Sequence, residues 1–140
     1  MRKTIMRVAS AINVRVYRLS GGKLLGRFRS GAPVCLLTTK GRKSGQPRTV
    51  PLLYLKEGDD LIVVASQGGA PQHPAWYLNL EAEPMAEVEI GHRRVPIVAR
   101  RVAEHERTEL WPRLVKFYPP YDEYQRRTTR PIPVIRLSPT

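Results

Sequence analysis

Cysteine and histidine are scarce in this sequence of 140 residues, which holds one and three of them. Cys35 lies in an apolar run, and a single thiol cannot form an intramolecular disulfide, so we interpret it as a small buried hydrophobic residue of a cytosolic protein. His73, His92 and His105 are far apart in the sequence, and no Cys/His spacing of the metal-binding kind is present. We therefore expect no metal site and no Cys-His catalytic pair.

Nucleotide-binding motifs and long apolar runs are also missing. The segment from Gly41 to Gly45 lacks the spacing and the Gly-Lys-Ser/Thr ending of a P-loop, and no G-x-G-x-x-G follows an apolar run. No apolar stretch approaches the roughly 20 residues that span a bilayer. Arg7, Asn13 and Arg15 interrupt the N-terminal region, so we expect no signal peptide and a cytoplasmic location. An enzyme with this sequence would take its chemistry from a bound cofactor.

Acidic residues are absent from positions 1–56, which hold 13 of the 24 Lys and Arg, whereas the rest of the chain has a net charge of −1. The excess positive charge suits nucleic acid, an anionic membrane surface or an anionic cofactor. Nucleic acid is disfavoured, because Tyr17 and Phe28 are the only aromatic residues before Tyr54.

Residues 4–19 follow a helical spacing, with apolar side chains at Ile5, Val8, Ile12, Val16 and Leu19, and Gly21-Gly22 ends the pattern. Two interpretations stay open for this basic amphipathic helix. It packs its apolar stripe on the rest of the protein, or residues 1–20 lie on the anionic inner face of the cell membrane. We expect residues 1–30 to form this helix and a connection, and residues 31–140 to form the main domain.

The main domain is expected to be mainly β with flanking helices. Alternating or continuous apolar runs predict about six strands in consecutive hairpins, at residues 34–37, 49–55, 61–65, 85–90, 95–99 and 133–137. Pro51 indicates an irregular or edge position for the second strand. Helical patterns cover residues 74–80 and 103–117, with one or two further turns at 122–128. This arrangement is typical of a small antiparallel barrel.

The first predicted hairpin encloses a basic loop, residues 38–48, with four cationic side chains, two glycines and three hydroxyls. Glycines let backbone N–H groups approach a ligand closely, and Lys and Arg add positive charge at the same place, which suits a phosphate. The alternative is an ordinary solvated turn. Further on, Ser66 ends the central strand, and Tyr118, Tyr121 and Tyr124 recur every three residues. On a helix these tyrosines would share one face, and a phenol is a proton donor at neutral pH.

Four blocks of sequence together resemble the deazaflavin-dependent nitroreductase family of actinobacteria, over roughly residues 20–138. The blocks are residues 37–48 (LTTKGRKSGQPR), 65–69 (ASQGG), 74–80 (PAWYLNL) and 118–125 (YPPYDEYQ). The resemblance implies a split β-barrel that binds coenzyme F420, an 8-hydroxy-5-deazaflavin with a phosphate and an oligoglutamate tail. It also implies hydride transfer from reduced F420 to a quinone, a nitroaromatic or another activated acceptor.

The resemblance also implies roles for individual residues. The phosphate and tail contacts match Arg42, Lys43, Ser44 and Arg48. The strands that border the ring match Thr49, Val50, Pro51, Leu52 and Leu53, and Val64, Ala65, Ser66 and Gln67. A second contact segment matches Ala75, Trp76, Tyr77, Leu78 and Asn79, and Tyr121 matches a tyrosine beside the substrate. As hypotheses for catalysis, Tyr121 caps the pocket and donates a proton, and Ser66 hydrogen-bonds the ring or the substrate.

Two positions depart from the family pattern. Gln67 stands where some members carry Lys, which would weaken attraction to an anionic tail, and the small Ala75 stands where Met occurs. Two alternatives to the F420 enzyme also remain: a split barrel that binds FMN, and an F420 carrier without turnover. By analogy with other barrels of this kind, a homodimer is expected.

Overall fold

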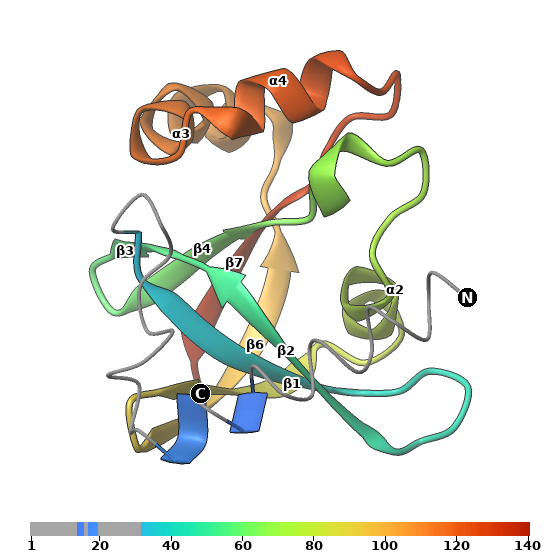
Figure 1. Cartoon of the computed structure of the whole chain (residues 1–140), viewed down its shortest axis with the longest axis vertical. Coiled ribbons are helices and arrows are strands. Elements are labelled where there is room, and N and C mark those ends of the chain that lie inside the picture. Colours follow the sequence, from blue (N-terminus) through green and yellow to red (C-terminus); the bar gives the residue numbers. More distant parts are fainter. Residues whose placement is uncertain (1–13, 16, 20–31) are drawn as a thin grey trace.

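The computed structural model describes residues 14, 15, 17–19 and 32–140. Seven antiparallel strands form one sheet in the order β2-β1-β5-β6-β7-β4-β3 (Figure 1). Their bounds are β1 (Val34–Lys40), β2 (Pro47–Leu53), β3 (Leu55–Glu57), β4 (Asp60–Val64), β5 (Met85–Ile90), β6 (Arg93–Arg101) and β7 (Val134–Pro139). The sheet curls until β2, at one end of the order, contacts β4 near the other. The expected antiparallel barrel is therefore confirmed as a half-barrel.

The second strand differs from the prediction. A single strand was expected over residues 49–55, but the chain changes partner at Tyr54: β2 pairs with β1, and β3 pairs with β4. The backbone N–H of Tyr54 donates to the carbonyl oxygen of Pro33 at 3.2 Å at this junction. The sheet thus has seven strands rather than six. The edge position that Pro51 indicated for β2 is confirmed.

The described helices are α2 (Ala75–Ala82), α3 (Glu104–Phe117), α4 (Pro120–Arg126) and a single 3₁₀ turn, η1 (Gln67–Gly69). α3 and α4 lie together over one end of the half-barrel, and α2 stands apart from them (Figure 1). Residues 14, 15 and 17–19 are helical, as expected. The other residues of the predicted N-terminal helix lie outside the described residues, so the alternative of a membrane contact through residues 1–20 stays open.

Alternation along the strands divides the apolar side chains between two cores. In β4 and the residue after it, Leu61, Val63 and Ala65 face the half-barrel interior, where they meet Cys35 and α2. Their neighbours Ile62 and Val64 point the other way, under α3 and α4. Successive side chains of a strand point to opposite faces, so the continuous apolar run predicted a strand covered on both sides. The expected burial of Cys35 is confirmed.

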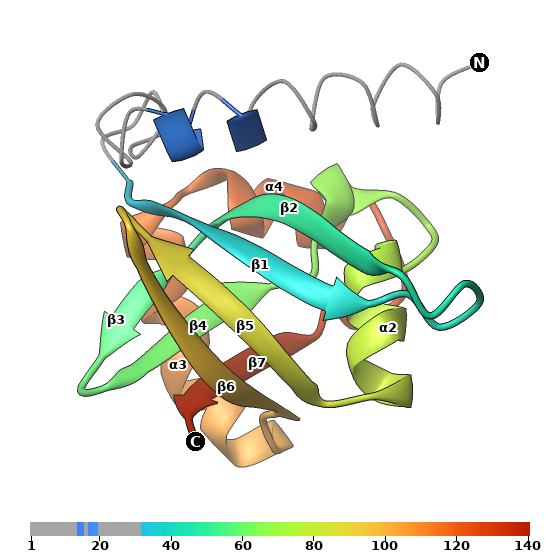
Figure 2. The ribbon, with the colours of Figure 1, turned by 90° about the horizontal axis from the view of Figure 1, so that it is seen from below.

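A third, smaller core joins the described part of the N-terminal segment to the sheet. Val14 and Tyr17 pack on the outer face of β1, against Val34 and Leu36 (Figure 2). The expected place of Leu19 on this stripe is wrong, because its side chain is 82% exposed. Each residue turns a helix by about 100°, so a residue two positions after Tyr17 lies on roughly the opposite side.

Polar contacts lock the same segment to β5. The Tyr17 hydroxyl accepts from the backbone N–H of Gly91 at 2.9 Å and donates to the carbonyl oxygen of Glu89 at 3.3 Å. The Glu89 carboxylate is itself buried, and it pairs with Arg18 at 2.9 Å and with Arg94 at 2.7 Å. A buried carboxylate needs such partners, since an uncompensated charge away from water is costly.

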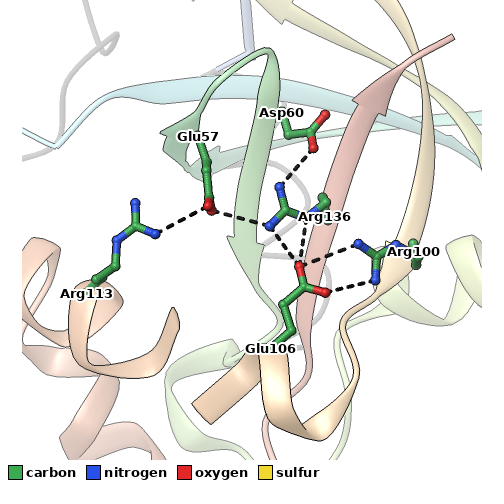
Figure 3. Close-up of polar contacts among 6 residues, drawn as sticks. All are labelled: Glu57, Asp60, Arg100, Glu106, Arg113 and Arg136. Atoms are coloured by element: carbon green, nitrogen blue, oxygen red, sulfur yellow. Dashed lines mark hydrogen bonds and ion pairs between the residues drawn. The ribbon is translucent and has the colours of Figure 1, made fainter. Parts of the chain in front are cut away.

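An ion-pair network ties α3 to the β3–β4–β7 region (Figure 3). Arg136 on β7 is its centre, with contacts of 2.9 Å to Asp60, 2.8 Å to Glu106 and 3.4 Å to Glu57. Arg100 extends the network through Glu106, and Arg113 extends it through Glu57. Because the Arg136 side chain is only 15% exposed, solvent screens its contacts less than those of a surface pair. Among the described helices, none has the length and apolar character that a membrane crossing requires.

Candidate functional site

The basic loop is shorter and more ordered than the sequence indicated. Thr38, Thr39 and Lys40 belong to β1, and Pro47 and Arg48 belong to β2, so only residues 41–46 form the connection. The predicted loop over 38–48 was too long because its ends pair across the hairpin, with Thr38 opposite Thr49 and Thr39 opposite Arg48. The hydroxyls of Thr38 and Thr49 lie 2.7 Å apart.

Internal hydrogen bonds hold the connection in one shape. The Gly41 N–H donates to Gln46 O at 2.8 Å, and the Gly45 N–H donates to Gly41 O at 2.8 Å. A Cβ on Gly41 would come within 2.8 Å of the Ser44 hydroxyl oxygen, and Gly45 has a positive φ of 72°. Both glycines are therefore required, one for a close approach and one for its backbone conformation. The Ser44 hydroxyl accepts from the Gln46 N–H at 3.1 Å and from the Arg48 guanidinium at 3.4 Å.

The cationic side chains of this loop face solvent without acidic neighbours. Arg42, Lys43 and Arg48 are exposed. None of the ion pairs found in the described part of the chain involves them. Most other arginines of the barrel are paired with carboxylates, whereas these three present their charge outward. Such a site attracts a polyanion.

Helix α2 fixes the loop from below. Asn79 is buried, and its Oδ1 accepts from the backbone N–H of Arg42 at 3.1 Å and from the Arg42 guanidinium at 3.3 Å. The Asn79 Nδ2 donates to the buried Thr39 hydroxyl at 3.0 Å. The structure thus brings Asn79 and Arg42 together, although 37 residues separate them.

The rest of the α2 segment is divided between the surface and the core. Ala75 is exposed and Leu78 is partly buried, whereas Trp76 and Tyr77 are buried in the interior core. The Tyr77 hydroxyl accepts from Arg101 at 3.2 Å. The cofactor contacts that the resemblance implied for these residues stay predictions.

Predicted ring-contact residues lie on β2 and at the end of β4. Val50 and Leu52 pack toward the interior core, whereas Leu53 packs on the opposite side. Val64, Ala65 and Ser66 are buried, and Gln67 is exposed. The two groups are brought together by the curl of the sheet, which places β2 beside β4.

The chain leaves β4 through three consecutive residues with positive φ: Gln67 at 45°, Gly68 at 63° and Gly69 at 83°. Gln67 is the only non-glycine residue with a positive φ in the described part of the chain. Such a conformation is unfavourable for a residue with a side chain, and it is found mostly where the surroundings enforce it, often at functional sites. The residues after Ser66 form the single 3₁₀ turn η1.

The tyrosines predicted to share a helix face do come together. Tyr118 follows α3, and Tyr121 and Tyr124 lie on α4, with ring centroids 4.9 Å apart for Tyr118–Tyr121 and 6.5 Å apart for Tyr121–Tyr124. Burial raises the pKa of the Tyr121 phenol well above its ordinary value, with smaller contributions from the two neighbouring tyrosines. Burial also raises the pKa of Tyr118 to about 12. Both phenols are fully protonated at neutral pH.

Two buried residues have a side-chain hydroxyl that forms no hydrogen bond with another described residue. Every wholly buried side-chain polar atom in the described part has a hydrogen-bond partner. The hydroxyls of Tyr121 and Ser66 have none among the described residues, although Tyr121 is only 5% exposed and Ser66 9%. Each hydroxyl is therefore available for a hydrogen bond to a ligand. These are the two residues that the sequence suggested for catalysis.

Two grooves of the described structure each include one of the predicted residues. A groove of about 360 Å³ between residues 14–19 and β2 includes Thr49, and a second of about 250 Å³ beside α2 includes Tyr77.

The sequence analysis did not identify Arg130. Its guanidinium donates hydrogen bonds to the backbone on either side of the turn that follows β4. Nothing in the sequence around Arg130 indicates a partner about 60 residues away.

Comparisons with known proteins agree with this arrangement. The model of the F420H(2)-dependent quinone reductase family matches residues 9–139. An F420H(2)-dependent quinone reductase of Mycobacterium tuberculosis is 40% identical over 126 residues, which cover 88% of this chain and 85% of the relative.

Two solved structures are similar in both fold and sequence. One, of an F420-H2 dependent reductase (FDR-A), is 44% identical and has a TM-score of 0.69. The match covers 76% of this chain and 94% of that one. Another, described as a domain-swapped dimer, is 40% identical and has a TM-score of 0.72. The match covers 91% of this chain and 96% of that one. This chain belongs to the F420H(2)-dependent quinone reductase family.

Proposed function

We propose that this protein reduces a quinone-type acceptor with reduced coenzyme F420. The observation that carries the proposal is the group of exposed cations on the β1–β2 hairpin, Arg42 and Lys43 on the connection and Arg48 on β2, at the same positions that the family resemblance assigns to the cofactor's phosphate and tail. The named relatives are F420H(2)-dependent reductases, and they share 40–44% of their residues with this chain.

The residues of the connection fit the anionic end of this cofactor. Arg42, Lys43 and Arg48 would hold the phosphate and the carboxylates of the tail by charge-assisted hydrogen bonds. Ser44 adds a hydroxyl, and Gly41 lets the Ser44 side chain and the Gln46 carbonyl pack closely within the loop. Because Asn79 holds the loop in place before any ligand arrives, little ordering is needed on binding.

The ring end of the cofactor fits a different part of the site. Thr49 to Leu53 and Val64 to Gln67 would border the ring, and reduced F420 supplies a hydride and a proton, which together convert a quinone into its hydroquinone. Tyr121 would hydrogen-bond an acceptor oxygen and hold a proton at its phenol, which its raised pKa keeps protonated. Ser66 would add a second hydrogen bond. The buried surroundings would keep water from the reacting atoms.

A rapid-mixing experiment tests the proposal. Reduced F420 is mixed with the protein and with menadione, a small naphthoquinone, and oxidation is followed by absorbance. A variant with Arg42, Lys43 and Arg48 all changed to Gln should bind F420 about tenfold or more weakly at low salt, and should lose most of the salt dependence of binding. Arg93→Gln, an exposed cation at the β5–β6 turn, is the matched control. Tight binding of FMN with no response to F420 would reject the proposal, and F420 binding without turnover would identify a carrier.

We also infer that the protein forms a homodimer in solution. The support comes from the 40%-identical solved relative that is described as a domain-swapped dimer. Light scattering after size-exclusion chromatography should give twice the 15.9 kDa mass of one chain. A mass of one chain across the concentration range would reject the inference.

A further inference from the structure

Arg130 follows α4 and makes polar contacts with the segment between β4 and α2. Its Nε donates to the carbonyl oxygen of Ala70 at 2.8 Å, its Nη1 to that of Ala65 at 3.2 Å, and its Nη2 to that of Ser66 at 2.8 Å. Its Nη1 also lies 3.1 Å from Nδ1 of His73. One guanidinium therefore connects both ends of a short segment that lies far away in the sequence.

The segment between these carbonyls contains the turn of residues 67–69, in which Gln67 has a positive φ of 45° that is unfavourable for a residue with a side chain. A turn of this kind persists only when its surroundings hold it in place. Arg is suited to this task, because its planar group carries five donors in fixed directions, which a flexible ammonium lacks. The hydrogen bonds from Arg130 therefore fix the directions of the carbonyl groups before and after Gln67. In this way they also fix the position of the Gln67 side chain.

Helix α4 holds the same turn from the other side. The Arg127 guanidinium donates to the carbonyl oxygen of Gly68 at 3.4 Å. Gly69 packs so closely on α4 that a Cβ would lie 2.6 Å from the carbonyl oxygen of Tyr124. Because Tyr121 lies on this helix, Tyr121 and Ser66 belong to segments that are packed directly against each other.

We propose that Arg130 is a positioning residue for hydride transfer: its guanidinium fixes the backbone from Ala65 to Ala70 and so sets the position of Ser66 relative to Tyr121. This inference rests on the proposed function. The cations that would hold the cofactor's charged end lie on a different segment, the β1–β2 connection. Loss of Arg130 should therefore slow transfer far more than it weakens cofactor binding.

The contact between Arg130 and His73 depends on the protonation state of the imidazole, and so on pH. Its Nδ1 accepts from Arg130 only when the ring is neutral. Burial and then the charge of Arg130 lower the pKa of His73; Glu81 raises it and Arg101 lowers it further, and the Tyr77 ring packs against the imidazole at 4.8 Å between centroids. Near neutral pH the contact is therefore present, and in acid a second positive charge would face the guanidinium.

Single-turnover kinetics test the proposal. The protein is loaded with reduced F420 and mixed with excess menadione, and both the first-order rate constant and the amplitude are recorded. Arg130→Lys should lower the rate constant about tenfold and Arg130→Ala about 100-fold, with the Kd for reduced F420 changed less than about threefold. Arg126→Ala is the matched control, since Arg126 is exposed on α4 and pairs with Asp122. It should leave both values unchanged.

The two readings of the kinetic trace distinguish positioning from stability. A rate constant does not depend on how much of the protein is folded, whereas the amplitude does. A reduced amplitude with an unchanged rate constant in both Arg130 variants would show a purely structural role and overturn the proposal. If Arg130→Ala does not fold, Arg130→Lys still decides between these outcomes. It keeps the positive charge but lacks the planar, forked arrangement of donors.

Hydrogen exchange of the ligand-free protein provides a test that needs no cofactor. In Arg130→Ala, the amides of residues 66–70 should exchange about tenfold faster or more, while those of β1 and β2 keep their rates. Unchanged exchange at residues 66–70 would overturn the clamp. If the wild-type protein transfers no hydride at all, the proposed function fails, and the exchange data still show whether Arg130 holds the segment.

Discussion

The side-chain oxygen of Asn79 lies 3.1 Å from the backbone nitrogen of Arg42 and 3.3 Å from a nitrogen of its guanidinium. A neutral, buried amide on α2 thus determines where the cationic loop sits. Because the Asn79 Nδ2 also donates to Thr39 on β1, the loop, the helix and the sheet meet at one side chain.

Replacement of Asn79 by Ala should weaken both stability and cofactor binding. It leaves the buried Thr39 hydroxyl and the Arg42 N–H without this partner, which costs about 2 kcal/mol of unfolding free energy. We expect F420 to bind about fivefold more weakly, because the loop must then be ordered on binding. Urea denaturation and a fluorescence titration measure the two effects, and Gln72→Ala, an exposed amide, is the control. Undiminished F420 affinity would show that the loop holds its shape without α2.

Gly69→Ala should be much more damaging than an equivalent change at Gly58. Both glycines have positive φ, but a Cβ at Gly69 would lie 2.6 Å from the Tyr124 carbonyl oxygen, whereas at Gly58 nothing lies within 4 Å. Gly58→Ala should cost about 1 kcal/mol through backbone strain alone. Gly69→Ala should cost roughly 3 kcal/mol, since it also pushes α4 away from the turn. Equal shifts in the midpoint of urea unfolding would argue against tight packing of the turn on α4.

Removal of Arg136 should destabilise the protein in a pH-dependent manner. The hydrogen bond from Arg136 holds the pKa of Asp60 below its ordinary value, and Arg100 and then Arg136 do the same for Glu106. Carboxylates with a lowered folded-state pKa contribute stability that is present above their unfolded pKa and is lost as the pH falls through the folded value. Arg136→Met should cost on the order of 1–2 kcal/mol at pH 7.

The difference between wild type and Arg136→Met should shrink below about pH 4, where the carboxylates become protonated. Thermal unfolding at a series of pH values measures this difference. Arg126→Met is a suitable comparison, because Arg126 forms an exposed pair within α4 alone and should have little effect at any pH. A stability difference that stays constant from pH 7 to pH 3 would exclude an electrostatic origin.

Tyr17→Phe should loosen the N-terminal segment without altering the half-barrel. The change removes the hydroxyl that accepts from Gly91 and donates to Glu89, at a cost of about 1 kcal/mol. Leu19→Ala should cost less than about 0.5 kcal/mol, because the side chain is exposed. Guanidinium unfolding curves of the two variants give the comparison. A larger loss of unfolding free energy for Leu19→Ala than for Tyr17→Phe would show that Leu19 belongs to the packed apolar stripe that the sequence indicated.

Local pattern was enough to predict most of the fold. The continuous apolar run of residues 61–65 predicted a strand covered on both faces, and the spacing of Tyr118, Tyr121 and Tyr124 indicated a cluster. These two predictions follow from the periods of two and about 3.6 residues. Pro51 indicated an edge strand because it has no N–H to donate to a neighbouring strand. The separate strand β3 was missed because nothing in the apolar run around Tyr54 shows that the pairing partner changes there.

Contacts between distant residues were beyond the reach of such patterns. The roles of Asn79 and Arg130 depend on hydrogen bonds to residues 37 and about 60 positions away. An amide in a helix and an arginine in a turn look ordinary in the sequence. The basic loop, Ser66 and the tyrosines stood out by composition and spacing, whereas the individual cofactor contacts came from the family resemblance and stay predictions.

The position of strand β7 in the sheet affects how the chain folds during its synthesis. It is the last strand along the chain, yet it lies between β6 and β4 in the sheet. Until residues 134–139 leave the ribosome, one edge of β4 and one edge of β6 stay open, and exposed edges invite pairing with other chains. Closure also joins residues that are more than 70 positions apart, as in the pair of Leu61 with Leu137, and such closure is slow. The nascent chain is therefore most exposed to aggregation in the interval before β7 inserts.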